Sequence, residues 1–123
     1  PFSGEGGVTE TEAAVVRNLV ESELVRTGRF SAVDRSNVEL VLAEKELSYA
    51  GLSPAQAAGE LARLSGAAIG VFGSVSKDKD GYRVSVGLAD TGGTALAYEY
   101  AYAQEDYLFR DASRRVAAAL AAR

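Results

Sequence analysis

The chain contains no histidine, cysteine, methionine or tryptophan. Without cysteine it can form no disulfide, thiol nucleophile or thiolate metal site. Without histidine it lacks the side chain best suited to proton transfer near neutral pH, and Ser-His and Cys-His nucleophile pairs are excluded within the chain. A metal ion could be held only by oxygen ligands, and no Asp-rich calcium loop is present. We therefore expect neither catalysis nor a cofactor.

The absence of methionine extends to position 1, which is Pro1. This predicts that the chain is an excerpt of a longer precursor or a processed form. Any signal peptide or lipid-anchor cysteine would then lie upstream. No apolar stretch of the sequence is long enough to span a membrane.

The length of 123 residues predicts a single domain over residues 1–123. Apolar residues make up 47% of the chain and charged residues 24%, which is enough apolar material for one packed core and an ordinary charge content. The formal net charge is −4. An acidic surface argues against nucleic-acid binding, because phosphate neutralisation needs a basic face.

Two helices carry strong end signals in the sequence. Residues 9–27 have apolar residues at helical spacing, with Thr9 and Glu12 at the spacing of a capping box and Gly28 as the C-terminal cap. The second of these helices is predicted to begin after Ser53.

Residues 54–65 have Ser53 as the N-cap, Pro54 at the first helical position and Gln56 at the capping-box position, and Gly66 ends the helix. Between these two helices, a short strand is predicted over 29–34 and a further helix over 37–48.

The second half of the chain changes to strand periodicity. Residues 67–76, 82–90 and 94–103 are separated by short turn sequences, which predicts a three-stranded antiparallel meander. A last helix is predicted over 106–122. The sequence thus predicts an α/β (α+β) domain with a mixed sheet packed by about four helices.

Four consecutive polar residues, Asp34 to Asn37, stand between the predicted strand and the following predicted helix. An acid, a base, a hydroxyl and an amide in a row resemble the contents of an active site. Ser36 and Glu39 have capping-box spacing, however, and Asp34 lies where a helix dipole favours an acid. Arg35 has no such structural role. It either pairs locally or presents a guanidinium fork to a partner, and we treat it as a candidate partner-binding residue.

Tyrosines alternate along the predicted strand 94–103. Tyr98, Tyr100 and Tyr102 fall on one face, with Leu96 beside them. Aromatic rows at strand spacing usually pack beneath helices. The alternative is that the row faces outward, as tyrosines at protein interfaces do. On that alternative, these three tyrosines are candidate partner-binding residues.

The pair Gly70 and Gly73 resembles part of a phosphate-binding loop. Such loops join a strand to a helix, whereas these glycines lie inside a predicted strand. Close approach of a helix, or a bulge, is the better explanation.

An ordered set of short segments resembles one family of bacterial envelope proteins. The segments are "TGRF" at 27–30, "VDR" at 33–35, Glu44, "GA" and "GSV" within 66–75, and "DTG" at 90–92. The family includes the CsgG-type curli secretion lipoproteins and the LpoB-type lipoprotein activators of penicillin-binding proteins. The amino-terminal domain of the TolB translocation protein is similar at a greater distance.

This resemblance implies a non-catalytic, periplasm-facing module that binds other envelope proteins, such as a penicillin-binding protein or a secretion component. It also implies anchoring to the outer membrane through an upstream lipidated segment. The alternatives are a self-associating subunit of an outer-membrane secretion complex of the curli type and, less favoured, a small-ligand binder. The family's long pore-forming insertions are absent, so pore formation is not expected.

Members of the family usually begin with an apolar strand that ends in "PF". Because this chain starts at Pro1-Phe2, most of that strand is expected to be missing. We expect the resulting sheet edge to be bare or filled by a neighbouring molecule, which would permit homo-oligomers.

Overall fold

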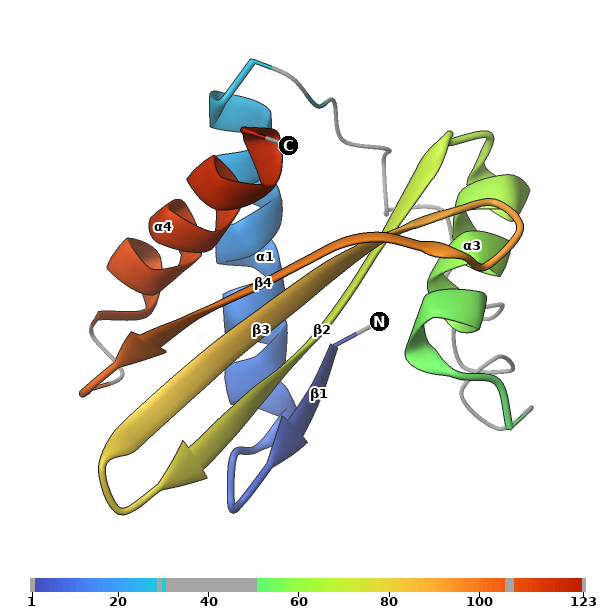
Figure 1. The fold of residues 1–123 in the computed structure, drawn as a ribbon. Helices are drawn as coiled ribbons and strands as arrows, with labels where there is room; N and C mark the ends of the chain where they lie inside the picture. The colour runs from blue at the N-terminus through green and yellow to red at the C-terminus, as the bar shows by residue number, and fades with distance from the viewer. Residues whose placement is uncertain (1, 29, 31–50, 106–107, 123) are drawn as a thin grey trace. The chain divides into compact units, whose positions relative to one another are not determined.

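The computed structural model describes residues 2–28, 30, 51–105 and 108–122 (Figure 1). In chain order the elements are β1 (Phe2–Glu5), α1 (Glu10–Arg26), α3 (Pro54–Ser65), β2 (Ile69–Asp78), β3 (Gly81–Asp90), β4 (Ala95–Ala103) and α4 (Phe109–Ala121). The strands form one sheet in the order β1-β2-β3-β4. This confirms the α/β fold with a mixed sheet. The predicted helix 37–48, and the predicted strand 29–34 except Phe30, lie outside the described residues.

The helix ends form as their sequences predict, except that Thr27 rather than Gly28 is the C-terminal cap of α1, and Gly28 follows it with a φ of 78°. Thr9 and Glu12 form a reciprocal capping box at the start of α1, and Ser53 and Gln56 form one at the start of α3. Gly66 ends α3 in the left-handed conformation, with a φ of 77°. These caps satisfy backbone donors and acceptors that a helix leaves unpaired at its ends.

The turn between β2 and β3 is shorter than the polar segment 77–81 between the predicted strands, whereas the turn between β3 and β4 extends one residue beyond the predicted segment, to Thr94. Strand β2 continues through Asp78, whose Oδ1 accepts a hydrogen bond from the Asp80 backbone N–H at 2.8 Å. In the second turn, Asp90 Oδ1 accepts bonds from the backbone N–H groups of Gly92 and Thr94, each at 3.0 Å. A carboxylate that binds nearby backbone donors is a standard device of tight turns.

The chain divides into two compact units. The described part of unit 1 comprises residues 51–72 and 87–97. The described part of unit 2 comprises residues 2–28, 30, 73–86, 98–105 and 108–122. Each of β2, β3 and β4 contributes residues to both.

The described part of unit 1 contains a buried cluster made largely of short side chains. Ala58 of α3, Phe72 of β2 and Ala89 of β3 form one buried cluster, with Ala55 packed against it. Gly87 lies so close to the Phe72 ring that a Cβ there would overlap it. Gly70 lies against the backbone of Ala58. The expectation that a helix approaches this strand closely is thereby confirmed for Gly70.

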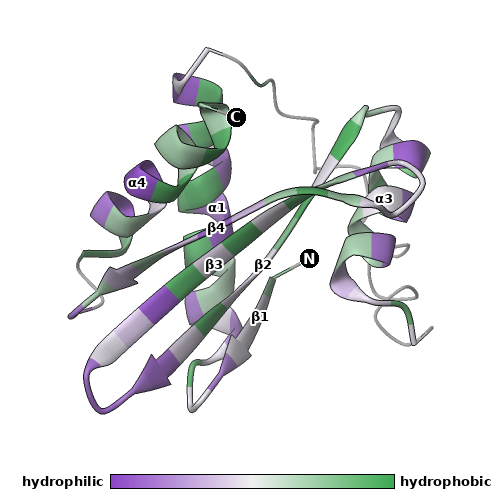
Figure 2. Cartoon of the chain, in the orientation of Figure 1, coloured by the Kyte–Doolittle hydropathy of each residue, from purple (hydrophilic) through white to green (hydrophobic). Residues whose placement is uncertain are grey.

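In unit 2, α1 packs against α4 (Figure 1). Tyr82 of β3 meets Phe109 of α4 edge to face, with ring centroids 4.9 Å apart. The largest fully buried aliphatic side chains of this unit come from both helices and from two strands: Val16, Val20, Val75, Val84, Val86 and Val116. The tip of the β2–β3 hairpin is hydrophilic, as Figure 2 shows.

The first strand is short, as expected, but its place in the sheet is filled. Strand β1 pairs in parallel with β2, in the register Phe2↔Gly73 to Glu5↔Ser76. The expectation of a bare or intermolecularly filled edge is therefore wrong over Gly73–Ser76. Four residues suffice because Gly6 and Gly7 adopt positive φ angles of 64° and 94°, which turn the chain directly toward α1.

Among the described residues, no helix has both the length and the apolar composition that crossing a membrane requires.

Candidate functional site

Strand β4 alternates between buried alanines and exposed tyrosines. Ala101 and Ala103 are buried, whereas Tyr98, Tyr100 and Tyr102 are 51%, 57% and 58% exposed. We call these three tyrosines the tyrosine row. Leu96, which belongs to unit 1, is also exposed. The alternation follows from strand geometry, which points successive side chains to opposite faces.

Within unit 2, the tyrosine row lies on the face opposite the helices. The contact of Tyr82 with Phe109 and the burial of Ala101 and Ala103 identify the face that packs on α4. The more usual arrangement, in which an aromatic row packs beneath helices, is therefore wrong for this chain. The alternative of an outward-facing row is what the structure has, although exposure alone does not test partner binding.

The row has a defined local geometry. The Tyr100 and Tyr102 rings meet edge to face at 83°, with centroids 5.7 Å apart. Such aromatic pairs are favourable beyond their buried area, so the contact restricts both side chains. Restricted aromatic groups with polar tips lose little entropy on binding, which suits a protein interface.

Short polar side chains accompany the row on β1 and β2. Ser3 and Glu5 are exposed, and their register partners Ser74 and Ser76 are half-buried. Between them Val75 is fully buried on the helix side. This part of the sheet thus offers aromatic rings and hydroxyl groups to a partner.

The end of β4 is tied to α4 by Arg115. Its guanidinium donates a hydrogen bond to the backbone carbonyl of Tyr102 and another, of 3.1 Å, to Asp111 Oδ2. One arginine thus fixes the strand end next to the tyrosine row.

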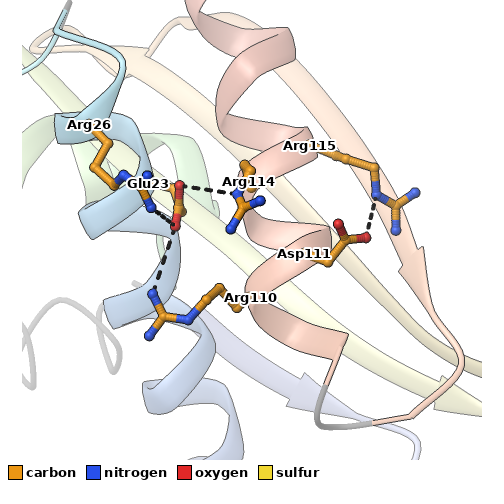
Figure 3. A network of polar contacts seen from close by, with 6 residues as sticks. All are labelled: Glu23, Arg26, Arg110, Asp111, Arg114 and Arg115. Carbon is orange, nitrogen blue, oxygen red and sulfur yellow. Dashed lines mark hydrogen bonds and ion pairs between the residues drawn. The ribbon is translucent and has the colours of Figure 1, made fainter.

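A cluster of charged residues joins α1 to α4 in unit 2 (Figure 3). Glu23 of α1 is only 3% exposed. Its carboxylate lies 3.4 Å from Nη1 of Arg26, 4.0 Å from Nη1 of Arg110 and 3.9 Å from Nε of Arg114. We call Arg26, Arg110 and Arg114 the arginine cluster. Because a buried carboxylate is costly unless cations compensate it, the cluster holds the two helices together.

Sequence reasoning missed this cluster, although a signal for it was present. Glu23 stands three residues after Val20 and seven after Val16, within the buried stripe of α1. A charged residue at a stripe position needs a counter-ion from the element packed against it. Only the fold identifies α4 as that element.

The other predicted site residue, Arg35, lies outside the described residues. The described ranges contain no group of three or more acidic side chains close enough to hold a metal ion. A hydrogen bond from Arg63 to Glu60, 2.6 Å long, lowers the pKa of the Glu60 carboxyl.

Comparison with known proteins identifies a matching family and solved structures that are similar to this chain. The family described as curli production assembly/transport component CsgG matches residues 7–105. The solved structures similar to this chain include TolB from Acinetobacter baumannii, with a TM-score of 0.60 and 19% sequence identity. That match covers 98% of this chain but only 27% of the TolB chain, so this chain spans about a quarter of TolB's length.

No curated protein matches the sequence. The likeness to TolB supports the fold alone, since the identity is low. The family match extends over most of the chain and includes α1, α3 and all three strands of the meander. This chain therefore belongs to the family of the curli production assembly/transport component CsgG.

Proposed function

We propose that this domain is a non-catalytic protein-interaction module of a bacterial cell-envelope protein, acting in the periplasm. The exposed tyrosine row is the observation that carries the proposal. Membership of the CsgG family supports the envelope setting. An upstream lipidated segment would tether the module to the outer membrane.

A binding role fits the chemistry of the side chains better than a catalytic one. The chain has no histidine or cysteine for proton transfer or nucleophilic attack. The Glu60 and Arg63 pair, whose pKa values are shifted, lies exposed on α3 rather than in an enclosed site. Catalytic pKa shifts usually come from burial and convergent polar groups.

The proposed partner is a peptidoglycan synthase, which this module would activate as the LpoB-type lipoproteins do. The tyrosine row would supply the contact area. Tyrosines dominate the energetics of many protein interfaces, because each buries a large ring and keeps a hydroxyl for hydrogen bonding.

The test is binding to the purified periplasmic domains of the host's penicillin-binding proteins, measured by biolayer interferometry. Replacing Tyr98, Tyr100 and Tyr102 together by serine is expected to weaken binding at least about tenfold. Leu64→Ser is the matched control, because Leu64 of α3 is 53% exposed and apolar.

The activating role has its own readout. Addition of the wild-type module should raise the rate of glycan polymerisation by the bound synthase, and the triple tyrosine variant should not. Binding that the triple variant retains in full would contradict the proposed surface. Binding without a rate change would contradict activation.

A second candidate is a self-associating subunit of a secretion or assembly complex. It is favoured by the position of β4 at the end of the strand order, with Glu99 as the one charged residue in its sequence. Edge strands with few charges invite pairing with another chain. Light scattering coupled to size-exclusion chromatography separates the two candidates: a strict monomer at high concentration contradicts self-assembly.

A further inference from the structure

The arginine cluster contains more positive charge than its carboxylate needs. Three guanidinium groups, Arg26, Arg110 and Arg114, surround the carboxylate of Glu23 (Figure 3). Counted over the described residues, this leaves two positive charges in excess. The nearest other acid on α4, Asp111, pairs with Arg115 at 3.1 Å. Within the described residues, no other acidic side chain forms an ion pair with the cluster.

The contacts to Glu23 leave most of the cluster's hydrogen-bonding capacity unused. Arg26 donates one long hydrogen bond of 3.4 Å, and Arg110 and Arg114 approach the carboxylate at 4.0 and 3.9 Å, beyond hydrogen-bonding distance. Each guanidinium carries several N–H donors in a planar fork. In the described part of the chain, the donors of Arg110 and Arg114 have no other hydrogen-bond acceptor.

The same arginines are open to solvent. The side chains of Arg26, Arg110 and Arg114 are 62%, 61% and 58% exposed, whereas Glu23 is buried beneath them. An incoming anion can therefore reach the guanidinium groups while Glu23 holds them in place. Such positioned forks bind carboxylates in bidentate geometry.

The placement of Arg110 is unfavourable for the helix itself. It lies in the first turn of α4, where the helix dipole disfavours a cation. Arg110 and Arg114 are also one turn apart, a spacing at which like charges repel. Fewer than three arginines would be enough to compensate the charge of Glu23.

We propose that the arginine cluster binds a carboxylate-rich segment of a protein partner. The surface is distinct from the tyrosine row: it lies on α1 and α4, on the helix side of unit 2. The inference rests on the proposed function only in taking the ligand to be a protein.

The charge pattern favours an acidic protein segment over other polyanions. Nucleic-acid binding needs an extended basic face, and this chain carries a net charge of −4. Recruitment to anionic lipid takes clusters of about four to eight basic residues, more than this cluster offers. Arg110 and Arg114 lie one turn apart on α4, so an acidic segment with more than one carboxylate can contact both.

The test uses a fluorescein-labelled oligoglutamate peptide as the probe and fluorescence anisotropy as the readout. The double variant Arg110→Gln/Arg114→Gln keeps Arg26 as the partner of Glu23 and is expected to weaken binding at least about tenfold. The matched control is Arg63→Gln/Arg83→Gln, which removes the same total charge from exposed arginines of α3 and β3. The control should change affinity less than about twofold.

A second variant guards against misfolding of the first. Arg110→Lys/Arg114→Lys keeps both positive charges but removes the planar guanidinium groups. This variant should have the circular dichroism spectrum of the wild type and bind the peptide with intermediate affinity. In NMR titrations of the wild type, the Nε–Hε signals of Arg110 and Arg114 should shift and that of Arg63 should not.

Three results would overturn the proposal. Equal losses in the Gln variant and its control would mean unspecific charge attraction. Tighter binding of the cluster to anionic vesicles or to DNA than to oligoglutamate would assign a different ligand. Absence of NMR shifts at the cluster would exclude the site. The triple tyrosine variant should bind oligoglutamate as the wild type does, so failure of the tyrosine surface is distinguishable from failure of this one.

Discussion

Gly70 of β2 lies against the backbone of Ala58 in α3, so that a Cβ at position 70 would stand 2.5 Å from the Ala58 carbonyl carbon. Backbone atoms cannot move aside as a flexible side chain can. The glycine is therefore a packing requirement of unit 1 and needs no phosphate ligand to account for it.

Gly70→Ala should destabilise the protein by about 2–3 kcal/mol, because the added methyl group forces α3 away from β2. The midpoint of urea unfolding measures this loss. Gly92→Ala is the control, since a Cβ there meets only the Asp90 carboxylate, at 3.3 Å. Equal stability of the two variants would contradict the close approach.

Ser113→Ala should raise stability by about 1 kcal/mol or more. Ser113 is fully buried in α4, and its hydroxyl has no hydrogen-bond partner in the described part of the chain. Its removal eliminates the cost of a desolvated, unpaired polar group. Thermal unfolding of the purified domain is the measurement.

The exposed Ser22 of α1 supplies the matched control for that variant. Ser22→Ala gains only helix propensity, about 0.5 kcal/mol. If Ser113→Ala gains no more stability than Ser22→Ala, the buried hydroxyl of Ser113 has a hydrogen-bond partner and the prediction is wrong.

Substitutions in the arginine cluster should be strongly non-additive. Each single substitution should lower the free energy of unfolding by about 0.5 kcal/mol, since two cations still face Glu23. The single variants are Arg26→Ala, Arg110→Ala and Arg114→Ala. The triple variant should cost about 3 kcal/mol, because the buried carboxylate then has no counter-ion. Urea unfolding of all four variants gives the comparison, and a triple cost equal to the sum of the singles would disprove mutual compensation.

Removal of Arg63 should raise the pKa of Glu60. The Arg63 hydrogen bond lowers that pKa in the folded protein, so its stabilising contribution is present above the unfolded pKa. The contribution is lost as the pH falls through the lowered value. An NMR pH titration of the Glu60 carboxyl in Arg63→Ala should show the upward change. In Arg83→Ala the titration should match the wild type.

The elements with strong local signals could be predicted from the sequence. Thr9, Ser53 and Gly66 satisfy or terminate backbone hydrogen bonds within a few residues of themselves, so local chemistry determines their roles. The strand alternation of residues 82–90 and 94–103 is likewise a local property.

The properties that depended on distant elements could not be predicted in the same way. Alternation along β4 separates two faces but does not say which one α4 covers, so the exposure of Tyr98, Tyr100 and Tyr102 needed the structure. Strand β1 pairs with Gly73–Ser76 of β2 because residues 2–7 turn the chain back toward α1 after only four strand residues. The contacts of Glu23 depend on the packing of α1 against α4.

The packing of α1 against α4 also constrains when this protein can fold during its synthesis. The ribosome releases α1 first, with the apolar side chains of Val16 and Val20 and the carboxylate of Glu23 still lacking the helix that covers them. Contacts between elements so far apart in sequence form late, because the intervening chain must be closed into a loop. Unit 2 is thus completed only after α4 has emerged. Until then, α1 lacks its contacts with α4, and transiently exposed apolar surface of this kind is prone to aggregation.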